Sequence, residues 1–272
     1  MSAPVEAGRR TASGFAVMTL VRHAAVVGLA GVGTGILVGG LGGRVAMRIS
    51  AIVAPDYVAG ALTEGGNRVG DITIGGTLAL VIFVGIFGGA LGAVAYVIVE
   101  PWLAVAGRWR DAAFAVIITA VAAPGTLTAD NSDFFILRHQ EINVAMFFGL
   151  FVAFGLLLPR AVRLADRKLP LIDPGRPVAS GVGYLAVALV GLQFVVAFFA
   201  QFFVDGTTDG PPNVPVGLVL GALAAVTIAV HGRRLQSRTT DWLIRVGSGL
   251  LIIAVALGSV RTGQSVIEIL EL

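Results

Sequence analysis

Cysteine is absent from the 272-residue chain, and charge is scarce, since only 13% of the residues are Asp, Glu, Lys or Arg. The lack of cysteine excludes disulfides, thiolate metal sites, iron–sulfur clusters and a cysteine nucleophile. Soluble domains carry about 25% charged and about 45–50% apolar residues, whereas this chain is 56% apolar. So little charge does not coat a water-soluble globule of this size. This excludes soluble enzymes, nucleic-acid-binding domains and disordered tails, and leaves an integral membrane protein.

Several signatures of membrane enzymes and pumps are also missing. The chain has no His-Glu-x-x-His sequence for an intramembrane metalloprotease and no Gly-x-Ser-x-Gly nucleophile elbow. Its single lysine, Lys168, lies between two apolar runs rather than in the last one, which excludes a retinal Schiff base there. No apolar run carries an acidic or basic residue near its middle, and this argues against a proton-relay pump.

The chain does contain seven long apolar runs. A transmembrane helix needs about 20 apolar residues to cross about 30 Å of hydrocarbon, and these runs lack the alternation of β-barrel strands. The sequence therefore predicts an all-α, polytopic transmembrane helix bundle of about seven spans. The spans cover residues 24–41, with a continuation toward 54, and residues 74–99, 112–127, 143–158, 181–204, 215–230 and 244–260. We expect residues 1–22 to form a cytoplasmic tail and residues 262–272 a short amphipathic tail.

The distribution of cations predicts the orientation. Of the 19 lysines and arginines, only Arg44, Arg48, Arg68, Arg138 and Arg261 fall on one side of a seven-span arrangement. Because loops rich in Lys and Arg stay in the cytoplasm, the N-terminus is expected inside and the C-terminus outside. Nearly all of the cations are arginine, which is typical of a GC-rich bacterial genome, so we predict a bacterial inner-membrane protein.

Glycines recur at every fourth position in three of the predicted spans. They are Gly31, Gly35, Gly39 and Gly43 in the first span, Gly85 and Gly89 in the second, and Gly217 and Gly221 in the sixth. Residues four apart share one helix face, and a face of small residues allows another helix to approach closely in lipid. Two interpretations stay open: packing inside the bundle, or an interface with other membrane protein subunits or with a second copy.

Polar residues gather at the predicted outer rim of the bundle. They are Arg44, Arg48, Glu64, Arg68, Asp71, Asp130 and Asp133. Asp130 and Asp133 follow a span that Pro124-Gly125 is expected to break, and a short interrupted span is a pointer to transporter binding sites. An anion or substrate site at the outer mouth, snorkelling arginines beside capped polar turns, and anchoring to lipid headgroups are the alternatives.

Two pairs of polar residues within or beside the spans need partners. His23 and His231 both lie at predicted cytoplasmic ends, so a bis-histidine haem is geometrically allowed. The alternative is a pair of ordinary interfacial histidines, and we predict neither a metal nor a cofactor. Gln193 and Gln201 share one face of the fifth span. We expect them to make interhelical hydrogen bonds or to line a polar pathway.

These observations favour a non-enzymatic membrane protein that acts as a helix-bundle subunit or partner of a larger assembly. A small-solute permease or channel with a site at the outer mouth is the first alternative. A lipid-modifying membrane enzyme is the second, with Asp130, Asp133 or Glu64 as acid or base and Arg44 and Arg48 holding phosphate.

Overall fold

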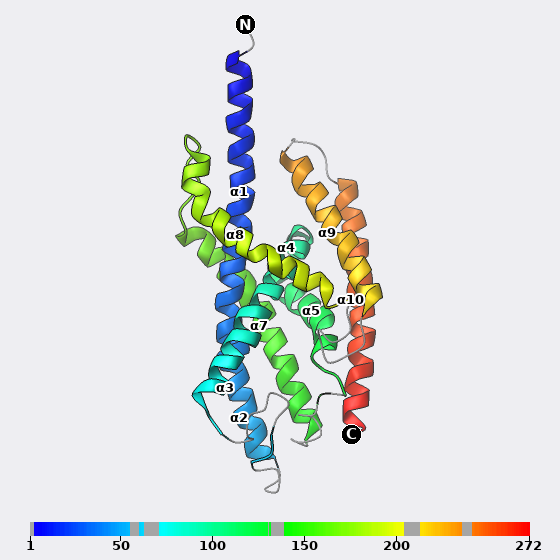
Figure 1. The fold of residues 1–272 in the computed structure, drawn as a ribbon. Coiled ribbons are helices and arrows are strands. Elements are labelled where there is room, and N and C mark those ends of the chain that lie inside the picture. The colour runs from blue at the N-terminus through cyan, green and yellow to red at the C-terminus, as the bar shows by residue number, and fades with distance from the viewer. Residues whose placement is uncertain are drawn as a thin grey trace.

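The computed structural model describes residues 3–54, 60–62, 71–129, 131, 139–203, 213–235 and 241–272. These residues form helices and no β-strand. The two ends of the chain lie at opposite ends of an elongated bundle (Figure 1). Among the described residues, six helical segments are long and apolar enough to cross a membrane: Gly14–Val53, Ile74–Gly125, Gln140–Lys168, Pro177–Ala200, Val214–His231 and Asp241–Leu270. The predicted apolar helix bundle is thereby confirmed, whereas the number of crossings and the orientation stay predictions.

The first segment is one long helical rod. It comprises α1 (Ala3–Gly35), the π-helical η1 (Ile36–Gly42) and α2 (Gly43–Val53). The predicted first span and its continuation toward residue 54 both lie within it. Residues 3–22, which the sequence assigns to a tail, form the first turns of α1.

The second segment folds back on itself at Gly107. It rises through α3 (Ile74–Ala79), the π-helical η3 (Leu80–Gly88) and α4 (Gly89–Leu103), and continues through the 3-10 turn η4 (Ala104–Trp109) into α5 (Arg110–Ala122). Gly107 has a φ of +52°, which glycine adopts without a steric penalty. The ring of Tyr96 in α4 packs edge-on against Phe114 in α5, with centroids 5.0 Å apart, so the predicted second and third spans form an antiparallel hairpin.

Four longer helices complete the bundle. They are α7 (Gln140–Lys168), α8 (Pro177–Ala200), α9 (Val214–Leu235) and α10 (Asp241–Leu270). Residues 262–270, which the sequence assigns to a short amphipathic tail, continue α10 without a break. No proline interrupts this stretch, and Ile269 is fully buried in a small apolar cluster with Ala123, Leu127 and Val144. The apolar side of the predicted tail therefore packs against protein.

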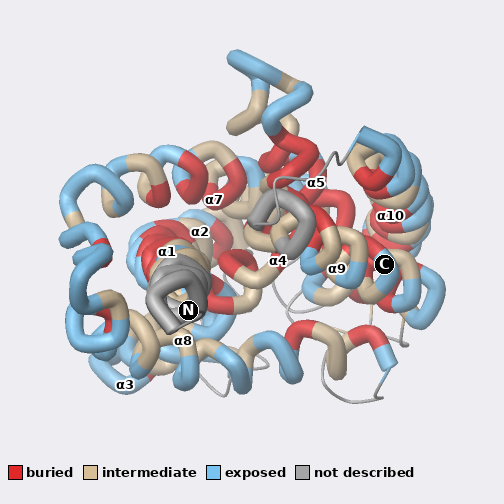
Figure 2. Tube along the Cα trace, turned by 90° about the horizontal axis from the view of Figure 1, so that it is seen from above, coloured by how far each residue is buried: buried red, intermediate tan, exposed pale blue. Residues whose placement is uncertain are grey.

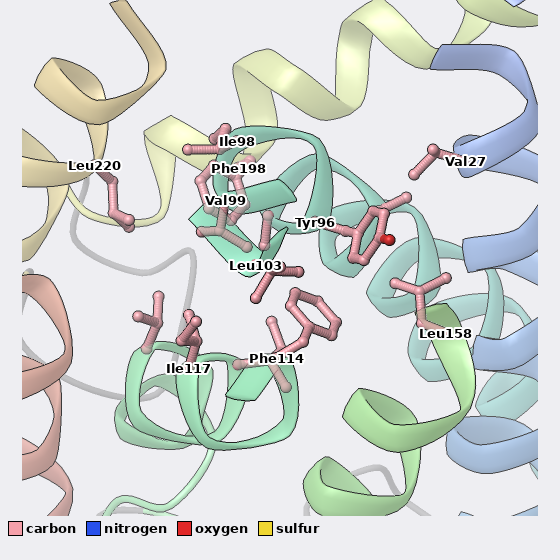
Figure 3. Packing of buried hydrophobic residues seen from close by; sticks show 14 of the residues in the cluster. Val27, Tyr96, Ile98, Val99, Leu103, Phe114, Ile117, Leu158, Phe198 and Leu220 are labelled. Carbon is pink, nitrogen blue, oxygen red and sulfur yellow. The ribbon is translucent and has the colours of Figure 1, made fainter. Parts of the chain in front are cut away.

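The core of the bundle is built around α4. Eleven of the 15 residues of α4 are buried, whereas only Gly181 and Phe198 are buried in α8. Figure 2 shows α4 in the middle of the bundle and α8 along its rim. In Figure 3 the rings of Tyr96 and Phe114 lie between Leu103, Leu158 and Val27, which come from α4, α7 and α1.

The glycine face of α1 is the surface on which α4 packs. A Cβ added to Gly31 would lie 2.6 Å from the Cβ of Ala93, and one added to Gly35 would lie 2.6 Å from the Cα of Gly89. A Cβ at Gly85 would meet the Cα of Ile36 at 3.0 Å. Real Cβ atoms keep greater distances, so α1 and the η3–α4 rod are this close only because these positions carry no side chain.

Candidate functional site

Of the residues predicted at the outer rim, three lie in the described part of the chain. Arg44 is half-buried and joins two helices, because its Nε donates to Thr77 Oγ1 at 3.0 Å and its Nη2 to the carbonyl oxygen of Thr73 at 3.1 Å. Arg48 and Asp71 are exposed. Arg44 is thus engaged in holding α2 against the start of α3.

The other four rim residues, Glu64, Arg68, Asp130 and Asp133, lie outside the described residues. The acid and base assignments of the lipid-enzyme hypothesis depend on them, so that hypothesis stays a prediction.

A small pocket lies at the same end of the bundle, where four helices meet. It has a volume of about 30 Å³ and is lined by Val121, Ala122, Pro124, Gly125, Gln201, Phe202, Asn213 and Arg261. These residues come from the end of α5, the end of α8, the start of α9 and the last third of α10. We refer to this set as the C-terminal pocket. Its three polar side chains come from three different elements, so only the folded bundle brings them together.

The break in α5 shapes one wall of this pocket. The α-helix ends at Ala122, and residues Ala123–Gly125 form a single 3-10 turn. Pro124 lacks an N–H and cannot continue the α-helical hydrogen bonding, while Thr126 and Leu127 both donate their N–H groups to the carbonyl oxygen of Ala123. The predicted helix break at Pro124 is confirmed.

The polar side chains of the C-terminal pocket differ in whether they already have hydrogen-bond partners. Gln201 donates from Nε2 to the carbonyl oxygen of Phe198, one turn earlier in its own helix, at 2.9 Å. Arg261 is half-buried, and its guanidinium makes no hydrogen bond or ion pair with any other described residue. Guanidinium groups carry five N–H donors and no acceptor, so Arg261 brings positive charge to the pocket, with donors that no other described residue occupies.

A second polar region lies at the opposite end of the bundle. His23 Nε2 of α1 lies 2.6 Å from Glu100 Oε2 of α4. Next to it, the buried Arg22 pairs with the carboxylate of Asp166 and donates to the carbonyl oxygens of Asp166, Leu169 and Pro170. Arg22 therefore satisfies the carbonyl groups that the end of α7 leaves without helical partners.

The same end holds a bidentate ion pair between α5 and α7. Both oxygens of Asp111 accept hydrogen bonds from Arg163 at 2.9 Å, and Arg160 Nε lies 3.4 Å from one of them. Arg110 donates from Nη2 to the hydroxyl of Tyr96 at 3.1 Å. At this end the sequence predicted only the histidine pair as candidate chemistry, and the structure adds a network of ion pairs and hydrogen bonds.

The two polar regions are separated by about the thickness of a bilayer. Along α1 and α2, 21 residues separate His23 from Arg44, and 23 residues separate their partners Thr77 and Glu100. At roughly 1.5 Å per residue these stretches span about 30–35 Å, against about 30 Å of hydrocarbon. The antiparallel rods are tied by polar contacts at two levels about 30–35 Å apart, with the glycine contacts between them.

The predicted glycine positions have different surroundings. Gly31, Gly35 and Gly39 lie against Gly85, Gly89 and their neighbours within the chain, and Gly217 lies against Phe202 and Phe203. Gly43 makes only one ordinary contact, and Gly221 has nothing within 4 Å. The glycines of the first and second spans are thus occupied inside the bundle, and an interface with other subunits or a second copy stays a prediction without support from them.

The two histidines of the haem hypothesis each have a partner in the structure. His23 contacts Glu100, and His231 donates from Nδ1 to the carbonyl oxygen of Thr227 at 2.9 Å, one turn earlier in α9. No cluster of three or more His, Asp or Glu side chains suited to a metal ion occurs among the described residues. The haem hypothesis for His23 and His231 stays a prediction.

The most specific contacts of the network were missed by the sequence analysis. His23 and Glu100 are 77 positions apart, and Arg22 and Asp166 are 144 apart. One signal was present: each of these residues lies at the border of an apolar run, on the side that the cation distribution assigns to the cytoplasm.

Comparisons of the chain with protein-family models, curated proteins and solved structures found no match.

Proposed function

We propose that this multi-pass membrane protein is a permease or channel for small polar solutes, with a binding site in the C-terminal pocket. The observation that carries the proposal is the convergence of Arg261, Gln201 and Asn213 on the broken end of α5. Broken helices that expose polar groups within a bundle are a recurring feature of transporter binding sites. This corresponds to the first alternative from the sequence, with a different set of residues.

The chemistry of the pocket favours an anion. A positively charged guanidinium offers only donors, and the amide groups of Gln201 and Asn213 add further N–H donors. A volume of about 30 Å³ holds about two water molecules, since one water needs at least about 10–15 Å³. A monatomic or similarly small anion that displaces this water would gain a charge-assisted hydrogen bond from Arg261.

A flux measurement tests the proposal. The purified chain is reconstituted into phosphatidylcholine vesicles loaded with a halide-sensitive fluorophore, and chloride entry is followed after an imposed gradient. We expect entry above the rate of protein-free vesicles, and at least a tenfold lower rate for Arg261→Gln, because this variant removes the one charged group among the described residues that line the pocket.

Arg245→Gln is the matched control. Arg245 belongs to the same helix, α10, but is exposed near its start, so this variant removes the same charge outside the pocket and should keep the wild-type rate. Chloride entry no faster than in protein-free vesicles, or equal rates for the two variants, would contradict the assignment of an anion site to Arg261.

A further inference from the structure

The turn between α4 and α5 and the facing part of α7 carry more arginines than carboxylates. Arg108 and Arg110 come from the turn, Arg160 and Arg163 from α7, and we call these four residues with Asp111 the arginine cluster. Arg110, Arg160 and Arg163 all lie close enough to Asp111 for Coulomb attraction. Both oxygens of Asp111 are already hydrogen-bonded to Arg163, so one carboxylate balances one of the four cations.

The excess charge is accompanied by an unused hydrogen-bond donor. Arg110 donates from Nη2 to Tyr96, but its Nε is buried and has no hydrogen-bond partner among the residues that the structure describes. Glu100, one turn after Tyr96, is hydrogen-bonded to His23. A buried, charged donor without a partner is unfavourable, so the cluster is chemically incomplete without an added acceptor.

The tip of the same turn exposes apolar side chains. Val105 is 76% exposed and Trp109 is 63% exposed, and the guanidinium of Arg108 lies 5.2 Å from the centre of the Trp109 ring. Tryptophan is enriched at the level of lipid headgroups. The turn therefore combines side chains suited to acyl chains with guanidinium groups suited to phosphate.

We propose that the arginine cluster binds the phosphate of an anionic phospholipid at the end of the bundle that carries the N-terminus. Planar guanidinium groups form paired hydrogen bonds with phosphate oxygens, and a phosphodiester supplies the missing negative charge beside the exposed guanidinium groups of Arg108 and Arg160. Basic pockets between transmembrane helices are typical sites for anionic headgroups. Inorganic phosphate offers the same oxygen chemistry, so the experiment includes both sources. The proposal concerns the opposite end of the bundle from the C-terminal pocket and does not depend on solute transport.

The test uses the full chain, purified in detergent and freed of lipid. Its thermal unfolding midpoint is titrated with short-chain phosphatidylglycerol, with phosphatidylcholine of the same chain length, and with inorganic phosphate against chloride at equal ionic strength. We expect phosphatidylglycerol to raise the midpoint at concentrations at least tenfold lower than phosphatidylcholine does. Arg160→Gln should weaken this effect about tenfold, and because the Arg160 side chain is 55% exposed, the variant should still fold.

Two further variants separate specific phosphate binding from a general effect of positive charge. Arg110→Lys retains the charge but loses the planar donor pair, so it should also weaken phosphatidylglycerol binding. Arg176→Gln removes an exposed cation from the α7–α8 connection and should leave binding unchanged. A response to inorganic phosphate that Arg160→Gln abolishes, without a preference for phosphatidylglycerol, would support the phosphate site and identify free phosphate as its source. No response to either phosphate compound, or an equal loss with Arg176→Gln, would overturn the proposal.

Discussion

Arg22 is a buried guanidinium whose hydrogen-bond acceptors all belong to the end of α7 and the residues that follow it. Its side chain is 6% exposed, whereas that of its ion-pair partner Asp166 is 53% exposed. Solvent screens the carboxylate, and exposed ion pairs contribute at most about 1 kcal/mol. Most of the stabilisation therefore comes from the hydrogen bonds to the three carbonyl oxygens, of which the Pro170 oxygen also accepts from the hydroxyl of Tyr184.

This difference in burial predicts that substitutions of Arg22 and Asp166 will lower the free energy of unfolding by different amounts. Arg22→Gln should lower the free energy of unfolding by about 2–3 kcal/mol, because buried carbonyl oxygens lose a charged donor. Asp166→Asn should cost about 1 kcal/mol or less, because Arg22 keeps its carbonyl acceptors. Thermal or denaturant unfolding in detergent, followed by circular dichroism, compares the variants. If Asp166→Asn destabilises the protein as much as Arg22→Gln does, the ion pair and not the carbonyl contacts provides most of the stabilisation by Arg22.

Helix α1 and the η3–α4 rod pack backbone against backbone at their glycines. This contact can be tested with a matched pair of substitutions in α1. A Cβ at Gly35 would fall 2.6 Å from the Cα of Gly89, whereas Gly33, half a turn away on the same helix, has nothing within 4 Å. Gly35→Ala should therefore destabilise the protein by about 1–3 kcal/mol through overpacking. Gly33→Ala should be neutral or slightly stabilising, because alanine is the better helix former. Equal unfolding midpoints for the two variants would contradict the packing seen here.

The elements also show which features hydropathy can predict. Apolar runs located every long helix, and Pro124 correctly marked the end of α5, because both signals are local. The helix ends were less accurate: α7 extends to Lys168 although its apolar run stops near 158, since a helix can continue into the headgroup region and beyond. Arg261 joined Gln201 and Asn213 in one pocket only through the packing of three helices. The spacing of residues within one apolar run does not predict which residues of different helices will line the same pocket.

At the scale of the whole molecule, polar side chains form two layers across the bundle. Arg22, Glu100 and Asp111 belong to one layer, and Arg44 and Arg261 to the other. Gly31, Gly35 and Gly39 of the first rod lie against residues 93, 89 and 84 of the second, so these two rods are antiparallel, and α4 and α5 form a hairpin. The first three apolar rods thus alternate in direction, which is the arrangement expected for successive membrane crossings.

This alternation makes the topology testable with reporters. If each apolar rod crosses once, the chain makes an odd number of crossings, and its ends lie on opposite sides of the membrane. This agrees with the ends of the chain lying at opposite ends of the bundle in Figure 1. With arginine-rich connections held in the cytoplasm, alkaline phosphatase fused after Leu272 should be active, because that enzyme folds only outside. The same reporter inserted after Gly175, between α7 and α8, should be inactive, while a green fluorescent protein at that position should fluoresce. Activity at both positions would contradict the seven-span arrangement, since the two sites would then share one side of the membrane.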